Sequence, residues 1–139
     1  MTVHELRINS NKFVENLDSY VESAIDDNEE LLNLNRKQLK EEHKTKKDQP
    51  ISPEYVAWYA RLKGFRTPDL FVTGELYRSM TIEAKGNQYD IKGHTDYTKK
   101  LIDKYTGDIF GIAISMQSQA KKLTTEALSK LYRRFVFKS

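Results

Sequence analysis

The sequence predicts an α+β fold with N-terminal helices, a small antiparallel β-sheet and a C-terminal helix packed on the sheet. Apolar residues recur at intervals of three and four over residues 11–28 and again over 115–135, as in helices that bury one face. Between them, residues 81–84 and 89–93 alternate apolar and polar side chains around a turn-rich connection of hairpin length. The 139 residues suffice for one domain with its own core.

Composition indicates a globular chain with a highly charged surface. Hydrophobic residues make up 38% and charged residues 31% of the chain. The 23 basic and 20 acidic residues leave a net charge of +3, an excess too small to indicate nucleic-acid binding by itself. The chain has no cysteine, which excludes disulfides and thiolate metal sites. We expect no secretory signal and no bilayer-spanning segment, which would need about 20 apolar residues.

Residues 1–39 are predicted to be the helical N-terminal part of the domain. The apolar side chains of residues 11–28 form one stripe, which Ser10 or Asn9 would cap and the polar residues 26–28 would end or bend. Further leucines continue the helical pattern to the end of this part. We interpret the stripe as a core face, with a subunit contact in an oligomer as the alternative.

Residues 40–53 are predicted to be an exposed, mobile and charged loop. Positions 40–50 mix acidic and basic side chains and contain no large apolar one before the proline. Lys44, Lys46 and Lys47 would be placed to touch an anionic partner such as a DNA phosphate. The simpler interpretation is a solvated loop.

Residues 54–139 are predicted to be the α+β core. Ser52 and Pro53 suit the start of a helix and Gly64 suits its end. Aromatic side chains on this helix would seal a small core or a subunit contact. Alternatively, they would stack on nucleic-acid bases beside neighbouring cations. The residues concerned are Tyr55, Trp58 and Tyr59, with Arg61, Lys63 and Arg66.

The stretch around Thr73 and Gly74 is predicted to be a sharp corner that starts a short helical turn. The Thr73 hydroxyl would cap free N–H groups, and Leu76 would share one face with Met80, four residues later. Ser79 is expected to make a hydrogen bond where this turn passes into the first strand.

The predicted hairpin needs further structure over it, because two strands alone are marginally stable in water. Residues 70–72 and 109–114 are the candidate third and fourth strands. One face of the hairpin would carry Ile82, Ala84, Tyr89 and Ile91.

The end of the chain is predicted to be helical. A short helix over residues 97–105 would be capped by Thr95 or Asp96 and ended by Gly107, and the C-terminal helix would follow. The tail, residues 133–139, sets bulky apolar side chains beside basic ones. Such a terminus docks on its own domain or on a neighbouring subunit.

No group of residues indicates catalysis. His94 and Asp96 are two potential metal ligands without a third at a supporting spacing. Ser79 lacks the Gly-x-Ser-x-Gly environment of a hydrolase nucleophile, and Glu75 and Asp90 have no specific signal as a glycosidase pair. We therefore expect no catalytic, cofactor or metal site.

The pattern Pro-x-Leu-Phe-x-Thr-Gly-x-Leu-x-x-Ser-Met resembles the signature of tail-completion and head-tail joining (neck) proteins of tailed phages. These are small virion morphogenesis proteins found where the head-tail connector meets the tail tube. The resemblance spans residues 68–112, and a later Phe-Gly segment is similar to a second family motif. The matching fold-motif positions are Leu70, Thr73, Gly74, Leu76, Ser79, Met80, Phe110 and Gly111.

The resemblance implies a non-enzymatic structural protein that forms a homo-oligomeric ring. Its partners would be virion proteins, namely a connector or portal-side ring and a tail tube or tail terminator. Its location would be the virion neck or tail end, after assembly in the host cytoplasm. The candidate partner interface comprises Lys44, Lys46, Lys47, Arg61, Arg66, Arg133, Arg134, Phe135 and Phe137. The alternative is a small basic nucleic-acid-binding protein that uses the loop lysines and the aromatic helix.

Overall fold

The computed structural model describes residues 1–86 and 88–137, and it confirms the α+β class. The helices are α1 (Val3–Glu15), α2 (Leu17–Ile25), α3 (Glu29–Lys37), α4 (Ala57–Lys63), α5 (Glu75–Ser79), α6 (Thr98–Tyr105) and α7 (Gln117–Val136). A π-helical turn, η1 (Gln38–Glu42), and two 3-10 turns, η2 (Gly107–Ile109) and η3 (Ile114–Met116), accompany them. The strands are β1 (Thr81–Lys85) and β2 (Gln88–Lys92).

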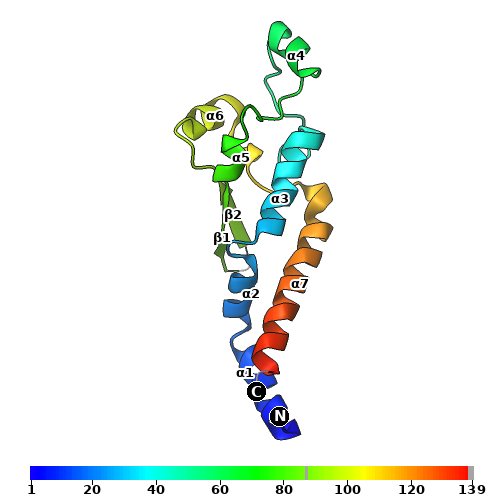
Figure 1. Cartoon of the computed structure of the whole chain (residues 1–139), viewed down its shortest axis with the longest axis vertical. Coiled ribbons are helices and arrows are strands. Elements are labelled where there is room, and N and C mark those ends of the chain that lie inside the picture. Colours follow the sequence, from blue (N-terminus) through cyan, green and yellow to red (C-terminus); the bar gives the residue numbers. More distant parts are fainter. Residues whose placement is uncertain (87, 138–139) are drawn as a thin grey trace.

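The molecule is elongated, with α1 and the end of α7 at one extremity and α4 at the other (Figure 1). We call α1, α2 and the part of α7 beside them the stalk, and residues 52–66 the arm. The remaining elements form the body, which holds most of the hydrophobic core.

The stalk starts earlier than predicted and is broken once. Thr2 caps α1 in a capping box with Glu5, so the helix begins ahead of the predicted Asn9 or Ser10. The single helix predicted over residues 11–28 is wrong, because α1 ends at Asn16. The side-chain amide of Asn16 donates to the Lys12 carbonyl at 2.9 Å and competes with the helical backbone pattern.

The long C-terminal helix is confirmed as α7. It packs mainly against α1 and α2, and also against α3. Its first turns reach the core beneath the sheet, where Met116 and Ala120 are buried in the same cluster as Ile82 and Ile91. The helix therefore meets the sheet with one end only, and the rest of its length builds the stalk.

The hairpin forms as predicted, and its register sets Ile82 opposite Ile91 and Ala84 opposite Tyr89, so these four residues share one face. It is the whole of the sheet within the described residues, so the predicted third and fourth strands are wrong. The backbone of residues 109–113 is satisfied by side chains of α3 and η1 instead of by a strand. The Asn35 side chain accepts a hydrogen bond from the Gly111 N–H at 2.9 Å, and the Gln38 side chain accepts one from the Ala113 N–H at 2.6 Å.

The other predicted strand, residues 70–72, is replaced by an irregular turn. Leu70 has a positive φ of 59°, which a strand does not allow. Its N–H donates to the Tyr55 hydroxyl at 3.2 Å, and the Phe71 N–H donates to the Asp69 carboxylate at 3.1 Å. Side chains thus take the place of a neighbouring strand here as well.

Two further helix boundaries differ from the prediction. The helix predicted from Ser52-Pro53 begins only at Ala57, after a cis Ser52–Pro53 bond, because the Tyr55 N–H pairs with the Arg66 carbonyl across the base of the arm. Its predicted end at Gly64 is confirmed, with φ at 90°. Neither Thr95 nor Asp96 caps α6, whose N-cap is Tyr97, and its C-cap is Thr106.

The loop at residues 40–53 is less exposed than predicted. Thr45 and Ile51 are buried, and Lys44 forms an isolated β-bridge with Pro50. The Lys46 N–H donates to the Asp108 carbonyl at 2.9 Å, which ties the loop to the body. Ile51 provides the apolar anchor for this packing.

Candidate partner interface

The fold-motif residues build the interior corner and do not form a surface. Leu70, Leu76 and Phe110 are buried, as predicted for a corner that pins the core. Leu76 and Phe110 meet over Gly93, where a Cβ atom would lie 2.8 Å from the Phe110 ring and 3.0 Å from Leu76. Gly93 is not one of the predicted motif residues, although it lies between the two halves of the motif.

Gly74 holds the N-cap position of the turn, and the Thr73 hydroxyl, one residue earlier, caps one free N–H group as predicted. Gly74 has φ at 81°, and a Cβ there would lie 2.8 Å from the Arg78 guanidinium, so a side chain is strained at this position. The exposed Thr73 hydroxyl accepts the Glu75 N–H at 3.3 Å. Gly111, with φ at 133°, is likewise in the region that favours glycine, and Lys46 packs over it.

Ser79 makes the predicted hydrogen bond at the junction with the strand. Its hydroxyl donates to the Leu76 carbonyl at 2.7 Å and accepts the His94 N–H at 3.0 Å. The His94 ring is 2.7 Å from the Thr81 hydroxyl. Within the described part of the chain, no three His, Asp or Glu side chains group as a metal site requires.

The loop lysines are paired with carboxylates. Lys44 lies 3.2 Å from Asp48, whereas Lys46 and Lys47 lie 3.7 and 3.3 Å from the two oxygens of Asp108. The hydrogen bond with Asp48 raises the pKa of Lys44 above its ordinary value. Each of these three cations therefore has a carboxylate of the same chain as its neighbour.

The arm is held by a buried polar network centred on Asp69. Both carboxylate oxygens lie 3.1 Å from the Lys63 ammonium, which also donates to the Phe71 carbonyl at 2.6 Å. The Tyr55 hydroxyl donates to Asp69 at 2.8 Å, and the Tyr77 hydroxyl donates to the Asp69 carbonyl. Burial, reinforced by the nearby carboxylate, raises the pKa of both tyrosines, so these hydroxyls stay protonated as donors.

Beyond this network the arm presents apolar side chains to solvent. Val56 is 60% exposed, Trp58 66% and Leu62 75%. Trp58 and Leu62 lie four residues apart on α4 and therefore share one face of the helix. Arg61 is exposed on the same helix and Arg66 is exposed at the base of the arm, and neither forms an ion pair within residues 1–86 and 88–137.

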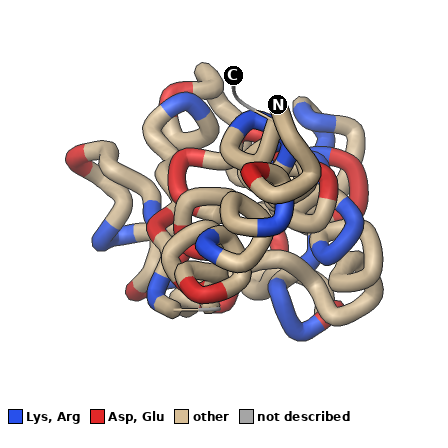
Figure 2. The backbone as a smooth tube through the Cα atoms, turned by 90° about the horizontal axis from the view of Figure 1, so that it is seen from below, with Lys and Arg blue, Asp and Glu red and all other residues tan. Residues whose placement is uncertain are grey.

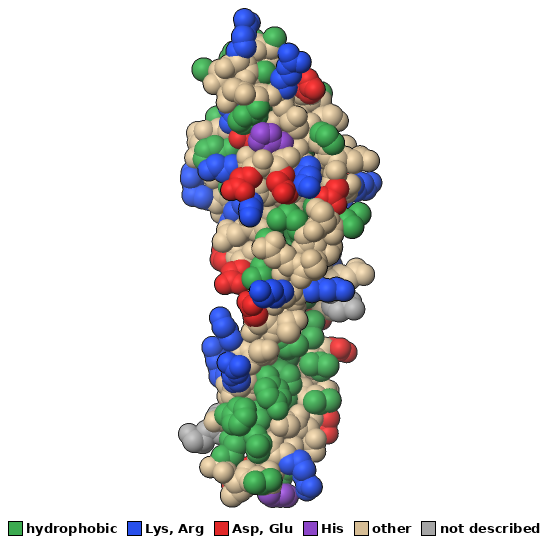
Figure 3. All heavy atoms as spheres, turned by 90° about the vertical axis from the view of Figure 1, so that its right-hand side faces the viewer, with side chains coloured by type: hydrophobic (Ala, Val, Ile, Leu, Met, Phe, Trp, Pro, Cys, Tyr) green, Lys and Arg blue, Asp and Glu red, His purple; other side chains and the backbone are tan. Residues whose placement is uncertain are grey.

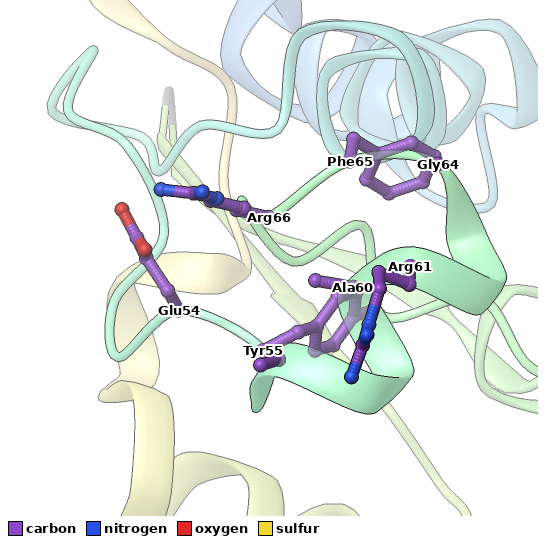
Figure 4. Close-up of a pocket in the computed structure, with 8 residues that line it drawn as sticks. Glu54, Tyr55, Ala60, Arg61, Gly64, Phe65 and Arg66 are labelled. Carbon is purple, nitrogen blue, oxygen red and sulfur yellow. The ribbon is translucent and has the colours of Figure 1, made fainter.

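A hollow of about 540 Å³ opens at the base of the arm. Figure 4 shows Arg61 and Tyr55 on one side of it, Phe65 on the other, and Arg66 and Glu54 across the neck of the arm. The combination of an apolar helix face and two unpaired guanidinium groups suits contact with another macromolecule.

The tail docks mainly on its own stalk. Val136 is buried, and the Phe135 ring lies 6.1 Å from Phe13 and 5.4 Å from Tyr20 between centroids. Phe137 is 58% exposed. Arg133 and Arg134 are exposed on the last turns of α7.

The predicted interface residues therefore do not form one surface. The arm carries Arg61 and Arg66, while Arg133, Arg134 and Phe137 lie at the opposite extremity (Figure 1). Seen from the stalk end, Lys and Arg segments alternate with Asp and Glu segments around the molecule (Figure 2). The net charge of +3 is thus not concentrated on a single basic face.

Sequence reasoning named the cations of the arm but did not predict that its apolar residues project from the fold. The sequence signal for the arm's attachment was Asp69, an acidic residue in an otherwise apolar stretch. A buried carboxylate needs a cation beside it, and Lys63 provides that cation.

None of the described helices is both long and apolar enough to cross a membrane. Comparisons with family models, curated proteins and solved structures found no match to this chain.

Proposed function

We propose that this chain is a structural virion protein of a tailed phage or prophage that joins the head connector to the tail or completes the tail. It acts without catalysis, through contacts with copies of itself and with neighbouring virion proteins. The resemblance at residues 68–112 gives the class, and the buried positions of Leu70, Leu76 and Phe110 are compatible with the motif's role in a corner of the core.

The observation that carries the proposal is the exposed face of the arm. Trp58 and Leu62 leave large apolar surfaces in water although the arm is fixed to the body by the Lys63–Asp69 pair. A helix that is held firmly and exposes tryptophan is typical of a binding anchor, because tryptophan dominates the binding energy of many interfaces. We propose that its partner is a neighbouring neck or tail protein with an apolar groove and an acidic rim, which would match Arg61 and Arg66.

The double variant Trp58→Ala/Leu62→Ala tests this role in the phage that carries the gene. Both side chains are exposed, so the variant should fold normally while unjoined heads and tails accumulate in electron micrographs. Ile114→Ala is the matched control, since Ile114 is 70% exposed on the body and far from the arm in sequence. Normal yields of joined particles from the double variant would contradict the proposal.

The alternative, nucleic-acid binding, keeps one supporting observation, namely that Arg61 and Arg66 are exposed on the same arm as Trp58. Most of the other cations it needs are already paired with carboxylates. DNA affinity that falls steeply as salt rises, and that Trp58→Ala abolishes, would favour this alternative over the structural role.

A further inference from the structure

We infer that copies of this chain associate side by side through their stalks, with the acidic outer face of α2 in one copy against the basic outer face of α7 in the next. The inference rests on the proposed ring-forming function and names the faces that make the ring. It comes from the distribution of charge along the stalk.

The two helices that pack together in the stalk, α2 and α7, carry opposite charge. The sequence of α2 contains Asp18 and Glu22 and no Lys or Arg, which gives it a net charge of −2. Over Gln117–Val136, five Lys or Arg stand against Glu126 alone, which gives α7 a net charge of +4. Although α2 and α7 pack together, no ion pair joins them in the part of the chain that the structure describes.

The acidic face contains a groove that is partly apolar. Leu17 and Val21 line it together with Asp18 and Glu22, and the hairpin turn at Gly86 closes one side of a space of about 430 Å³. The Gly86 N–H donates to Glu22 at 3.2 Å, which fixes that carboxylate at the rim. Leu17 is 40% exposed, so the groove offers apolar area as well as charge.

The outer face of α7 is basic. Lys130 and Arg133 lie three residues apart on this helix and are both exposed, so they share one face. Figure 3 shows an apolar band along the stalk that is bordered by Lys and Arg side chains. A stalk only two helices thick leaves such side chains partly open to solvent.

The two faces belong to different helices of the stalk. The groove is lined by α2 and by Gly86 at the hairpin turn, and no residue of α7 lines it. The Phe135 ring packs on Tyr20, so the end of α7 lies beside α2. A contact that joins two different faces is heterologous, and when it is repeated from copy to copy it gives a closed ring or an open filament.

Charge reversal of the purified full-length chain tests the inference by sedimentation or light scattering. We expect a multimer at about 0.1 M salt that dissociates toward 16.2 kDa at about 1 M, because screening weakens exposed ion pairs. Asp18→Lys/Glu22→Lys and Lys130→Glu/Arg133→Glu should each be monomeric, since each variant brings like charges together. An equimolar mixture of the two variants should recover the parent mass, because each reversed face then meets its complement.

Lys99→Glu/Lys100→Glu, with the same change of charge on exposed residues of α6, is the control and should keep the parent mass. Circular dichroism verifies that each variant is folded. If the parent assembles but the reversals keep its mass, or the mixture stays monomeric, the stalk contact is wrong while the proposed function stands. A parent that is monomeric under all conditions would overturn the contact and the ring together, whereas failure of the arm test in the phage would leave the stalk contact untouched.

Discussion

Asp69 joins the arm to the body, because its carboxylate is the common partner of Lys63 on α4 and Tyr55 at the arm's base. Its side chain is only 6% exposed, and that of Lys63 is 17% exposed. Because both side chains are largely removed from water, either charge would be costly without the other. The ion pair therefore holds α4 in one position relative to the body. The direction of the exposed α4 face is thus determined by one buried ion pair.

Asp69→Asn should therefore destabilise the protein by about 3–5 kcal/mol, because it leaves the Lys63 ammonium buried without its counter-ion. Denaturant unfolding measures this change in the free energy of unfolding. Asp103→Asn, at an exposed position of α6, removes the same charge and should change stability by less than about 0.5 kcal/mol. Equal effects of the two substitutions would refute the role given to Asp69.

Asp48 shows how the loop at residues 40–53 is tied down. Its carboxylate accepts the Ser115 hydroxyl at 2.5 Å and the Ser115 N–H at 2.8 Å, and these bonds, with Lys44, hold its pKa below the ordinary value of 3.8. The folded-state pKa is depressed, so the ionised carboxylate stabilises the native state above about pH 3.8. That contribution is lost as the pH falls through the lowered pKa.

Ser115→Ala should raise the pKa of Asp48 toward 3.8, because the hydroxyl donor is lost while the backbone N–H remains. The acid-induced loss of this contribution should then begin at a higher pH. An NMR titration of the carboxyl carbons reports both the change and its control, Asp90, whose pKa is lowered by Lys85 and should not move. An unchanged pKa at Asp48 would show that Ser115 does not stabilise its charged form.

At the scale of elements, the two halves of the family-like motif meet at one glycine. Leu76 on α5 and Phe110 after η2 both pack against Gly93, at the end of β2. The motif therefore joins the corner, the hairpin and the segment 109–113 into one core. Substitutions here should act on stability and not on a binding surface.

Gly93→Ala should destabilise the fold by about 1–3 kcal/mol, because the added Cβ would overlap the Phe110 ring and Leu76. Thermal unfolding measures the effect. Gly107→Ala is the matched control, since nothing lies within 4 Å of a Cβ built there. Two variants of equal stability would contradict this packing.

The elements that sequence could predict are those that depend on local periodicity. The hairpin register and α7 follow from the alternation and the spacing of their own apolar residues. The absence of a strand at residues 109–114 could not be predicted in the same way. It depends on Asn35 and Gln38, whose side chains accept hydrogen bonds from backbone N–H groups about 75 residues later in the chain. The break at Asn16 likewise depends on a side chain that competes with the helix it ends.

For the candidate interface, sequence identified the residue types but not their separation. In the sequence the loop lysines form an unpaired basic cluster, but the fold places Asp48 and Asp108 beside them. In the same way, Phe135 is a candidate interface residue in the sequence, but in the structure its ring packs near Phe13 and Tyr20. Point substitutions are thus cleaner tests than removal of residues 133–139, which would also strip Val136 from the stalk.

At the scale of the whole molecule, the arm and the stalk lie at opposite ends (Figure 1). We propose that they make two kinds of contact: the arm would bind a different virion protein through Trp58 and Leu62, and the stalk would bind further copies of the chain through its oppositely charged faces. An elongated subunit of this kind suits a ring in which the stalks contact each other laterally and each arm binds an adjoining protein.

The proposed function is best tested by electron cryomicroscopy of phage particles from the genome that encodes this chain. We expect a ring of copies at the junction of head and tail, with each arm seated on an adjoining protein and the stalks side by side. Joined particles that contain no copy of the chain, shown by imaging and by mass spectrometry of the same sample, would contradict it.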